Sequence, residues 1–482
     1  MKKLATILAI AAALTMLACG GGSQGTDETT PGDVPGDDAA TDEGSGDAIN
    51  DASPEDLPPV VPDSFQVGYA ELDITPPVGT ILGGYGVPAM NRVTEGTHDP
   101  LMAQAALFTN NAGQALLLIS ADLAGYMWDF GDWGPGIKVL RQSIVDALAP
   151  TMAITPEQIV IASSHSHGAS DLMGFSQEID EGPDKELLAT TITQFTSLAQ
   201  AAAAALKPAT VLYGKTNLEG ISARDKDCSP VLDTEVGIIQ AQDGQDKVIV
   251  TIANFAKHPT IAPESNRLAT ADFIWGYREE MKKATDAPAM YFQGFEAAVH
   301  GRYSFYDEED FWDKVYEIGK NLADAVLAVS GSLTPAGDFG IQSREATYSC
   351  VGRESFMVDA YTYMGLPKRF IDVQQDGTLL VREIPVSWHR LGNAEFVAFP
   401  GEPSPEYGGM AKERMSSSFK FALGLANDAT GYMVEPQSLA NDTTGQLEGY
   451  ELKMGLGPDA GPSAWDALQG LGWFDGGWQQ EP

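Results

Sequence analysis

The segment Gln158-Ile159-Val160-Ile161-Ala162-Ser163-Ser164-His165-Ser166-His167-Gly168 joins a β-branched apolar run to two histidines flanked by small residues. Such a run is typical of a buried strand, and α/β enzymes commonly present a site at the carboxyl end of a strand. The chain has only six histidines, so a pair two residues apart stands out. On an extended backbone both rings point to one side, where one can bind a metal and the other lie beside it. The alternative is two histidines satisfied by backbone carbonyls.

Around this segment, apolar runs that predict strands alternate with stretches that predict helices. The predicted strands are 115–119, 159–162, 248–254 and 394–399, and the predicted helices are 136–148, 185–206, 273–284, 311–329 and 405–416. Alternation of this kind, without an internal repeat, favours a layered α/β architecture. We therefore predict a single large α/β domain over residues 63–458. Residues 459–482 are expected to form an irregular tail, with no further β-sandwich module after the domain.

The amino terminus is predicted to be an export signal. Lys2 and Lys3 precede the apolar run 4–17, which is too short to span a membrane comfortably. The run ends at Met16-Leu17-Ala18-Cys19-Gly20, which looks like a bacterial lipobox with Cys19 as the lipidated residue. We expect residues 1–19 to be a lipoprotein signal peptide and the protein to be exported to the bacterial cell envelope. An ordinary cleavable signal with a chance cysteine is the alternative.

Residues 20–62 have the composition of a disordered tether. They contain 11 acidic residues and no lysine or arginine, among Gly, Ser, Thr and Pro, and cannot bury enough apolar surface to fold. As a coil they would reach on the order of 35 Å from the membrane. The net charge of −38 also argues against nucleic acid as a partner, because phosphate binding needs clustered basic residues. No pattern in the sequence indicates an oligomeric state.

Export would allow a disulfide between the two remaining cysteines, Cys228 and Cys350. Their spacing does not decide the matter, and two unpaired buried cysteines are the alternative.

Three more polar side chains follow apolar runs. His258 comes after the run 248–252, and Glu402 follows 396–399 through a Pro-Gly turn, at the expected start of a helix that would favour its ionised form. Tyr432 follows the segment 423–431. Their common position at strand ends favours a joint site more strongly than any one of them does alone.

Together these segments resemble, in order and in flanking residues, those of the neutral ceramidases, over nearly the whole folded region. The resembling segments are Gly83–Gly86, Glu95–Leu101, Ser163–His167 (Thr-His-Thr-His in the family), Asn254–Thr260 (Asn-Trp-Phe-Ala-x-His-x-Thr), Asn266–Asp272 with Gly276–Tyr277, Pro400–Glu402, and Gly424–Tyr432 (Gly-Leu-x-Asn-x-x-x-x-Tyr).

The resemblance implies a zinc ion held by His165, His258, Glu402 and Tyr432, with His167 either beside the ligands or as an acid/base group. Two imidazoles, a carboxylate and a phenol suit zinc and leave room for a water. The resemblance also implies that Arg224 stabilises an oxyanion, although a surface or salt-bridged arginine is the alternative. His98 and Asp272 lie in resembling segments and are candidates for contact with the substrate.

One loop departs from the family. The family places a Gly-Asp-x-Ser-Pro-Asn loop after an apolar strand, whereas this chain reads Gly294-Phe295-Glu296-Ala297-Ala298-Val299-His300-Gly301-Arg302 and lacks the Asp and the Ser. His300 is a candidate replacement, or else a solvent-facing loop residue.

The sequence therefore predicts a lipid-anchored zinc hydrolase that cleaves an amide bond, with N-acyl sphingoid (ceramide-like) lipids as the first expectation for the substrate. The alternatives are a zinc hydrolase acting on another amide or an ester, and a metal-stabilised binding lipoprotein without activity.

Overall fold

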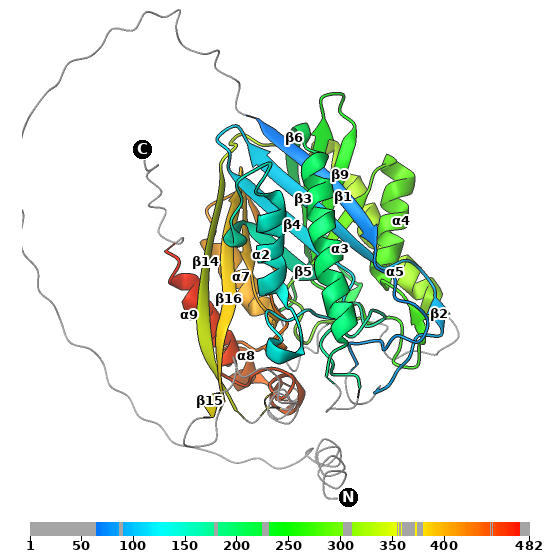
Figure 1. Cartoon of the computed structure of the whole chain (residues 1–482), viewed down its shortest axis with the longest axis vertical. Helices are drawn as coiled ribbons and strands as arrows, with labels where there is room; N and C mark the ends of the chain where they lie inside the picture. The colour runs from blue at the N-terminus through cyan, green and yellow to red at the C-terminus, as the bar shows by residue number, and fades with distance from the viewer. Residues whose placement is uncertain are drawn as a thin grey trace, which may run out of the picture. The chain divides into compact units, whose positions relative to one another are not determined.

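The computed structural model describes residues 64–85, 90–177, 182–223, 231–301, 311–353, 355, 358, 372–373, 379–443, 445 and 447–472. Residues from Asp63 onward form one compact unit, in which strands and helices alternate as in an α/β protein (Figure 1). The predicted fold class is therefore confirmed. The predicted signal peptide with Cys19 and the predicted tether lie outside the described residues.

The larger of two main sheets is mixed. Its neighbouring strands are β11 (Ala289–Gln293), β9 (Val248–Phe255), β8 (Glu235–Asp243), β6 (Lys207–Asn217), β1 (Phe65–Asp73), β3 (Met102–Asn110), β4 (Ala115–Ala121) and β5 (Ile159–Ser163), and β13 (Thr334–Pro335) pairs with β6. The pairs β4–β5 and β9–β11 are parallel, whereas the other pairs along this path are antiparallel.

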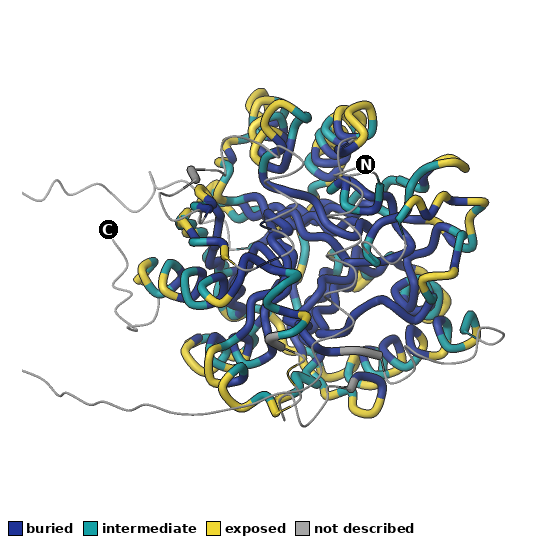
Figure 2. Tube along the Cα trace, turned by 90° about the horizontal axis from the view of Figure 1, so that it is seen from below, coloured by how far each residue is buried: buried dark blue, intermediate teal, exposed yellow. Residues whose placement is uncertain are grey.

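Both faces of this sheet are buried, as the period of two along its strands shows. In β4, Leu117 and Ile119 belong to one apolar cluster, while Leu116 and Leu118 belong to another. Helices cover the first face: α3 (Lys185–Ala204) lies over β1 and β3 with α2 (Ile137–Leu148) beside it, while α4 (Phe273–Thr285) lies near β11 and α5 (Phe311–Val329) near β6 (Figure 1). The exposed residues lie largely on the outer sides of helices and in loops (Figure 2).

A second sheet covers the other face. It contains β14 (Ile341–Gly352), β16 (Leu379–Leu391), β17 (Ala394–Ala398) and β19 (Phe419–Leu423), with β15 (Asp372–Val373) beside β16. Its inner side chains, such as Phe396 and Phe421, share a cluster with Phe108 and Leu118 of the large sheet.

Two helices pack on this second sheet, α7 (Pro405–Arg414) beside β19 and α9 (Ala460–Gln469) beside β14 and β16. Helix α9 corrects the expected irregular tail. Its residues Ala464 and Leu468 recur at helical spacing and are fully buried, which composition alone did not reveal.

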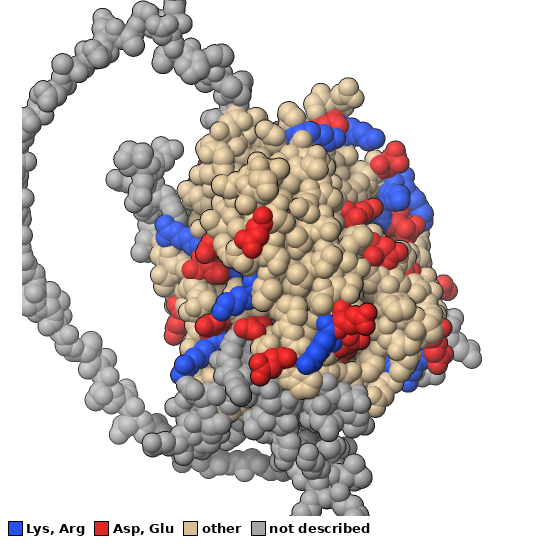
Figure 3. Space-filling model, in the orientation of Figure 1, with Lys and Arg blue, Asp and Glu red and all other residues tan. Residues whose placement is uncertain are grey.

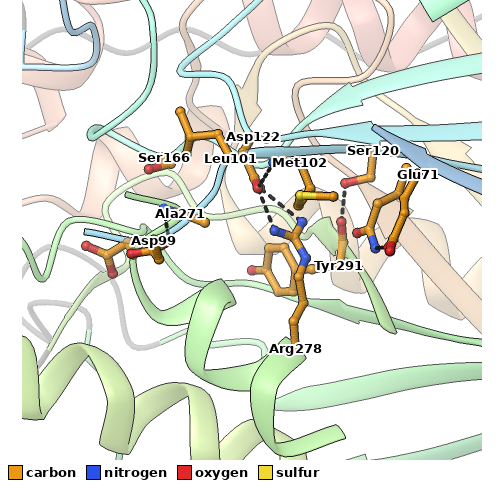
Figure 4. Close-up of polar contacts among 12 residues, drawn as sticks. Glu71, Asp99, Leu101, Met102, Ser120, Asp122, Ser166, Ala271, Arg278 and Tyr291 are labelled. Carbon is orange, nitrogen blue, oxygen red and sulfur yellow. Dashed lines mark hydrogen bonds and ion pairs between the residues drawn. The ribbon is translucent and has the colours of Figure 1, made fainter. Parts of the chain in front are cut away.

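The large sheet coils so that its first and last strands approach each other. Ser120 Oγ in β4 donates to the Tyr291 carbonyl in β11 at 2.5 Å, and Gln104 Nε2 in β3 donates to the Ala289 carbonyl at 3.0 Å. A buried ion pair lies nearby, in which the Arg278 guanidinium of α4 donates to both carboxylate oxygens of Asp122 at 2.5 and 3.1 Å (Figure 4). This coiling brings the carboxyl ends of β5 and β9 to one place.

Charged side chains of both signs lie on the described surface. On the face shown in Figure 3, basic residues are scattered among acidic ones and form no patch. Among the described helices, none combines the length and the apolar character that a membrane crossing requires.

Candidate metal centre

Four side chains meet where strands of both sheets end. His165 follows β5 and His258 follows β9, while Glu402 and Tyr432 begin the short strands β18 (Glu402–Pro403) and β20 (Tyr432–Met433), which pair in parallel with Glu402 opposite Tyr432. All four residues are buried, at 2 to 7 % exposure. The structure therefore brings together the four residues that the sequence placed on a metal.

The backbone at His165 is held in an unusual conformation. Its φ is +67°, a left-handed value that is uncommon for a non-glycine residue. The His165 amide donates to the Leu123 carbonyl at 2.9 Å, and the preceding Ser164 amide donates to the Ala121 carbonyl at 2.8 Å. These contacts with the end of β4 turn the imidazole out of the strand direction.

The segment 424–427 ties the two sheets together beside this turn. Asn427 exchanges two hydrogen bonds with Ile161 of β5, through its side-chain oxygen at 2.9 Å and its amide at 2.7 Å. Gly424 donates its amide to the Gln293 carbonyl at the end of β11, at 3.0 Å. Tyr432 is thereby brought toward His165 by a segment that runs along the large sheet.

Backbone carbonyls orient both imidazoles. His165 Nδ1 lies 2.5 Å from the Ala124 carbonyl, and His258 Nδ1 lies 3.2 Å from the Val299 carbonyl. Because a carbonyl only accepts, each Nδ1 carries the proton and each Nε2 presents a lone pair in the neutral ring. Metal-binding histidines are typically fixed in this way.

The Nε2 atoms of both histidines lie near oxygen atoms that could share a metal ion with them. Glu402 Oε2 lies 3.3 Å from His165 Nε2 and 3.1 Å from His258 Nε2, and the Tyr432 hydroxyl lies 3.3 Å from His258 Nε2. Zinc binds such donors at about 2.0 to 2.1 Å in a tetrahedron, which places neighbouring donors about 3.3 Å apart. The observed spacings fit a divalent ion shared by these atoms.

The charges of these groups depend strongly on one another. Burial alone would raise the pKa of Glu402, but His165 and His258 outweigh it, so that this pKa lies well below its usual range. Burial lowers the pKa of His165, but the Glu402 carboxylate raises it above the ordinary value. Burial also raises the pKa of Tyr432, as does the Glu402 charge, which keeps the phenol neutral. Glu402 is thus the anionic centre of the group.

One part of the expectation for Glu402 needs correction. The sequence predicts that a helix N-terminus favours its ionised form, but α7 begins at Pro405 with Ser404 as the N-cap residue. Glu402 lies before the cap, in β18, and the two imidazoles favour its charge instead.

His167 lies on the pocket side of the same group. Its Nε2 is 3.1 Å from His165 Nε2, and its buried Nδ1 has no hydrogen-bond partner among the described residues. Burial and the neighbouring histidines lower its pKa well below the ordinary value. The Arg92 guanidinium donates to the His167 carbonyl, and the Tyr85 ring packs edge-on at 4.6 Å.

Glu296, which the sequence pattern did not single out, lies at the same centre. Donor atoms of His165, His258, Glu296 and Glu402 all lie within 4.8 Å of one another. Burial raises the pKa of Glu296 well above its usual range, and the Glu402 charge raises it further. The signal was available, because Glu296 follows the apolar strand β11 just as the other residues follow theirs.

The remaining candidates lie elsewhere. Asp272 is buried as the N-cap residue of α4 and accepts from the amides of Ala262 and Phe273, each at 2.8 Å, so it fixes the chain after His258. His98 is half-buried, stacks on Trp312 with ring centroids 3.6 Å apart, and lies 2.8 Å from an Asp99 carboxylate oxygen. Neither residue lines the pocket beside the metal group among the described residues.

Other predictions concern residues that the structure does not describe. Arg224 and Cys228 lie outside the described residues, and of His300 only the backbone is described, in β12 (His300–Gly301), which pairs with β7 (Ser222–Ala223). Cys350 is a buried cysteine of β14, and burial raises the pKa of its thiol to about 12. Pairing of Cys228 with Cys350 stays a prediction.

A small pocket of about 70 Å³ opens beside the group. Its polar lining residues are His165, His167, Asp171, Ser176, Glu402, Tyr432 and Tyr450. Its apolar lining residues include Met173, Phe175, Leu425, Ala429 and Met454. A larger, open depression of about 550 Å³ lies near Thr155 and Leu471. Because His165, His167 and Glu402 belong to the groups that could hold a metal and line the small pocket, we take this pocket as the candidate site.

Comparison with solved structures then decides the fold. The chain matches neutral ceramidase from Pseudomonas aeruginosa with a TM-score of 0.67 and 15 % identity, over 85 % of this chain and 74 % of that one. This chain has a neutral ceramidase fold. A ceramidase complexed with C2 gives a TM-score of 0.66 and 14 % identity over 85 % and 75 % of the two chains. No protein-family model and no curated protein sequence matches this chain.

Proposed function

We propose that this chain is a zinc-dependent hydrolase that cleaves the amide bond of a ceramide-like N-acyl lipid. The observation that carries the proposal is that Glu402 Oε2 lies 3.3 Å from His165 Nε2 and 3.1 Å from His258 Nε2, beside a pocket in a neutral ceramidase fold. The two imidazoles and the carboxylate would hold the ion, with the Tyr432 hydroxyl as a fourth donor.

Bound zinc supplies Lewis-acid chemistry, since it polarises an amide carbonyl and activates a water for attack. Within the chain, the Ala124 and Val299 carbonyls keep the two Nε2 lone pairs directed at the centre. His167 lines the pocket and is neutral in its resting state, so that it can accept a proton from water and deliver it to the leaving amine nitrogen.

The pocket lining supports a lipid substrate. Met173, Phe175 and Leu425 offer apolar contact to an acyl chain, and His165, His167 and Glu402 line the same pocket. In this arrangement an N-acyl lipid would place its amide at the histidines and its chain along the apolar side chains. The similar fold of known ceramidases makes a ceramide-like lipid the first choice.

We also propose that the protein acts as an exported lipoprotein. The sequence around Cys19 and the acidic composition of residues 20–62 support this. A lipid anchor with a tether would hold the hydrolase near its substrate in a membrane. Labelling with a radioactive fatty acid should mark the wild-type chain and not Cys19→Ala, and equal labelling of both would refute the anchor.

The function is tested by turnover. Purified protein is incubated with N-acyl sphingosines, other N-acyl amines and matching esters, and the products are identified by mass spectrometry. The zinc content of the same protein is measured in parallel. We expect amide hydrolysis that is lost in His165→Ala and Glu402→Ala and retained in His389→Gln, which alters a buried histidine of the second sheet. Preference for esters would change the assigned bond.

Two results would overturn the proposal. One zinc ion per chain without turnover of any amide or ester would leave a metal-stabilised binding lipoprotein. If the wild type binds no zinc and both site variants behave like the wild type, the site itself is wrong.

A further inference from the structure

We propose that Glu296 is an additional metal ligand of this centre, so that the ion is bound by two imidazoles and two carboxylates. The inference rests on the proposed function only in requiring a metal at the same site. The loop that carries Glu296 is the one in which the chain lacks the Asp and the Ser of the ceramidase sequence pattern.

The backbone fixes Glu296 beside the other ligands. The Glu296 carbonyl accepts from the Val299 amide at 2.8 Å, and the Ala297 amide donates to the Pro403 carbonyl at 3.1 Å. Pro403 is next to Glu402, and the Val299 carbonyl orients His258. One short turn therefore positions Glu296 against two of the proposed ligands.

The Glu296 side chain has no other partner among the described residues. It is 0 % exposed, and neither of its carboxylate oxygens has a hydrogen-bond partner there. A buried carboxyl group without a hydrogen bond or an ion is costly, and buried charges are normally paired or bound to metals. A cation between Glu296 and Glu402 removes this cost.

The position of Glu296 fits the role of a metal ligand better than that of a residue that contacts the substrate. Its oxygen lies within 4.8 Å of donor atoms of His165, His258 and Glu402, whereas His167 groups with the two histidines and not with the carboxylates. His167 lines the pocket, but Glu296 and His258 do not. Glu296 thus approaches the centre from the protein side, together with His258.

A glycine makes room for this carboxylate. A Cβ atom at Gly424 would lie 3.2 Å from Glu296 Oε2 and 2.6 Å from the Gly294 carbonyl. A second carboxylate also changes the chemistry of the centre, because it balances the charge of a divalent ion and adds a hard oxygen donor. We therefore expect tighter binding and a higher coordination number than His165, His258, Glu402 and Tyr432 give alone.

The test compares metal binding by the wild type, Glu296→Gln, Glu296→Asp and Glu345→Gln. Glu345 is a matched control, since it is a largely buried carboxylate that pairs with Arg141 at 2.8 Å, away from the centre. Zinc affinity is measured by competition with a chromogenic chelator, and coordination by the visible absorption of bound Co²⁺, whose intensity falls as the coordination number rises.

We expect Glu296→Gln to weaken zinc binding by more than the about 10- to 100-fold that is typical of residues that merely orient ligands. Its Co²⁺ absorption should become more intense, Glu296→Asp should recover part of the affinity, and Glu345→Gln should match the wild type. An unchanged affinity and Co²⁺ spectrum in Glu296→Gln would overturn the inference.

Two further measurements keep the inference separate from folding and from the proposed function. If Glu296→Gln fails to fold, X-ray absorption of the zinc-loaded wild type still counts the ligands, and a count that leaves no place for a second carboxylate refutes it. Loss of zinc in His165→Ala but not in Glu296→Gln would refute this inference alone. Zinc retained in both His165→Ala and Glu402→Ala would refute the proposed site and this inference with it.

Discussion

Replacing Gly84 by alanine should displace His167. Gly84 has a φ of +97°, and an added Cβ would lie 2.3 Å from His167 Cγ and 2.6 Å from Cδ2. Carbon atoms in contact are about 3.5 Å apart, so the ring would have to move by about 1.2 Å. Overpacking of this kind typically costs about 1 to 3 kcal/mol, beyond the backbone cost of a left-handed alanine of about 1 to 2 kcal/mol.

The matched control is Gly79→Ala. Gly79 has nearly the same φ, +98°, but no atom lies within 4 Å of the position that a Cβ would take there. The difference between the two variants in free energy of unfolding, measured with urea, therefore isolates the contact with His167. We expect Gly84→Ala to be less stable by about 1 to 3 kcal/mol.

The same displacement should reduce turnover. A misplacement of about 1 Å in a catalytic group can lower the rate about 100-fold, whereas zinc content should be unchanged because the three atoms nearest the added Cβ all belong to His167 and not to a proposed ligand. If Gly84→Ala and Gly79→Ala have equal stability and equal turnover, the packing of His167 against this glycine does not matter and the reasoning fails.

Three further changes have defined outcomes. Tyr432→Phe removes the hydroxyl that lies 3.3 Å from His258 Nε2, and should weaken zinc binding about 10-fold in the chelator assay; unchanged affinity would exclude Tyr432 as a donor. Asp122→Asn leaves Arg278 buried without its counter-charge and should cost about 3 to 5 kcal/mol in urea unfolding, whereas Glu383→Gln in the exposed Lys138 pair should cost less than about 1 kcal/mol; equal costs would refute the contrast. Burial and the Arg141 charge lower the pKa of His389 to about 3, so below about pH 6.5 the unfolded state binds a proton that the folded state does not. Stability should therefore fall by up to about 1.4 kcal/mol per pH unit between pH 6.5 and 3, and His389→Gln should remove this part of the slope; parallel curves would contradict it.

The sequence predicted the main elements well where apolar periodicity decides them. The predicted helix 311–329 coincides with α5, and the predicted strand 394–399 differs from β17 by one residue. Strands such as β6, β14 and β16 were not among the predicted ones. The tail was predicted wrongly, because Gly and Pro near 457–462 concealed the helical spacing of Ala464 and Leu468. Local patterns thus identified elements better than composition did.

The candidate site was predicted in its residues but not in its geometry. Strand-end positions singled out His165 and His258. The Ala124 and Val299 carbonyls, which keep the proton on each Nδ1, come from segments that are distant in the sequence. Glu296 was missed because its loop was compared with a family pattern that lacks it, although it follows β11 directly. Long-range backbone contacts of this kind leave no local trace in a sequence.

The order of the ligands along the chain affects the stage of folding at which the metal centre forms. Glu402 lies 144 residues after His258, and Tyr432 lies 174 residues after it, later in the sequence than all strands of the second sheet. Closing such long loops is slow, and an ion that binds only the finished arrangement stabilises the folded state alone. The complete centre therefore exists only once both sheets have docked, and a chain that stalls before the second sheet docks lacks Glu402 and Tyr432 at the site.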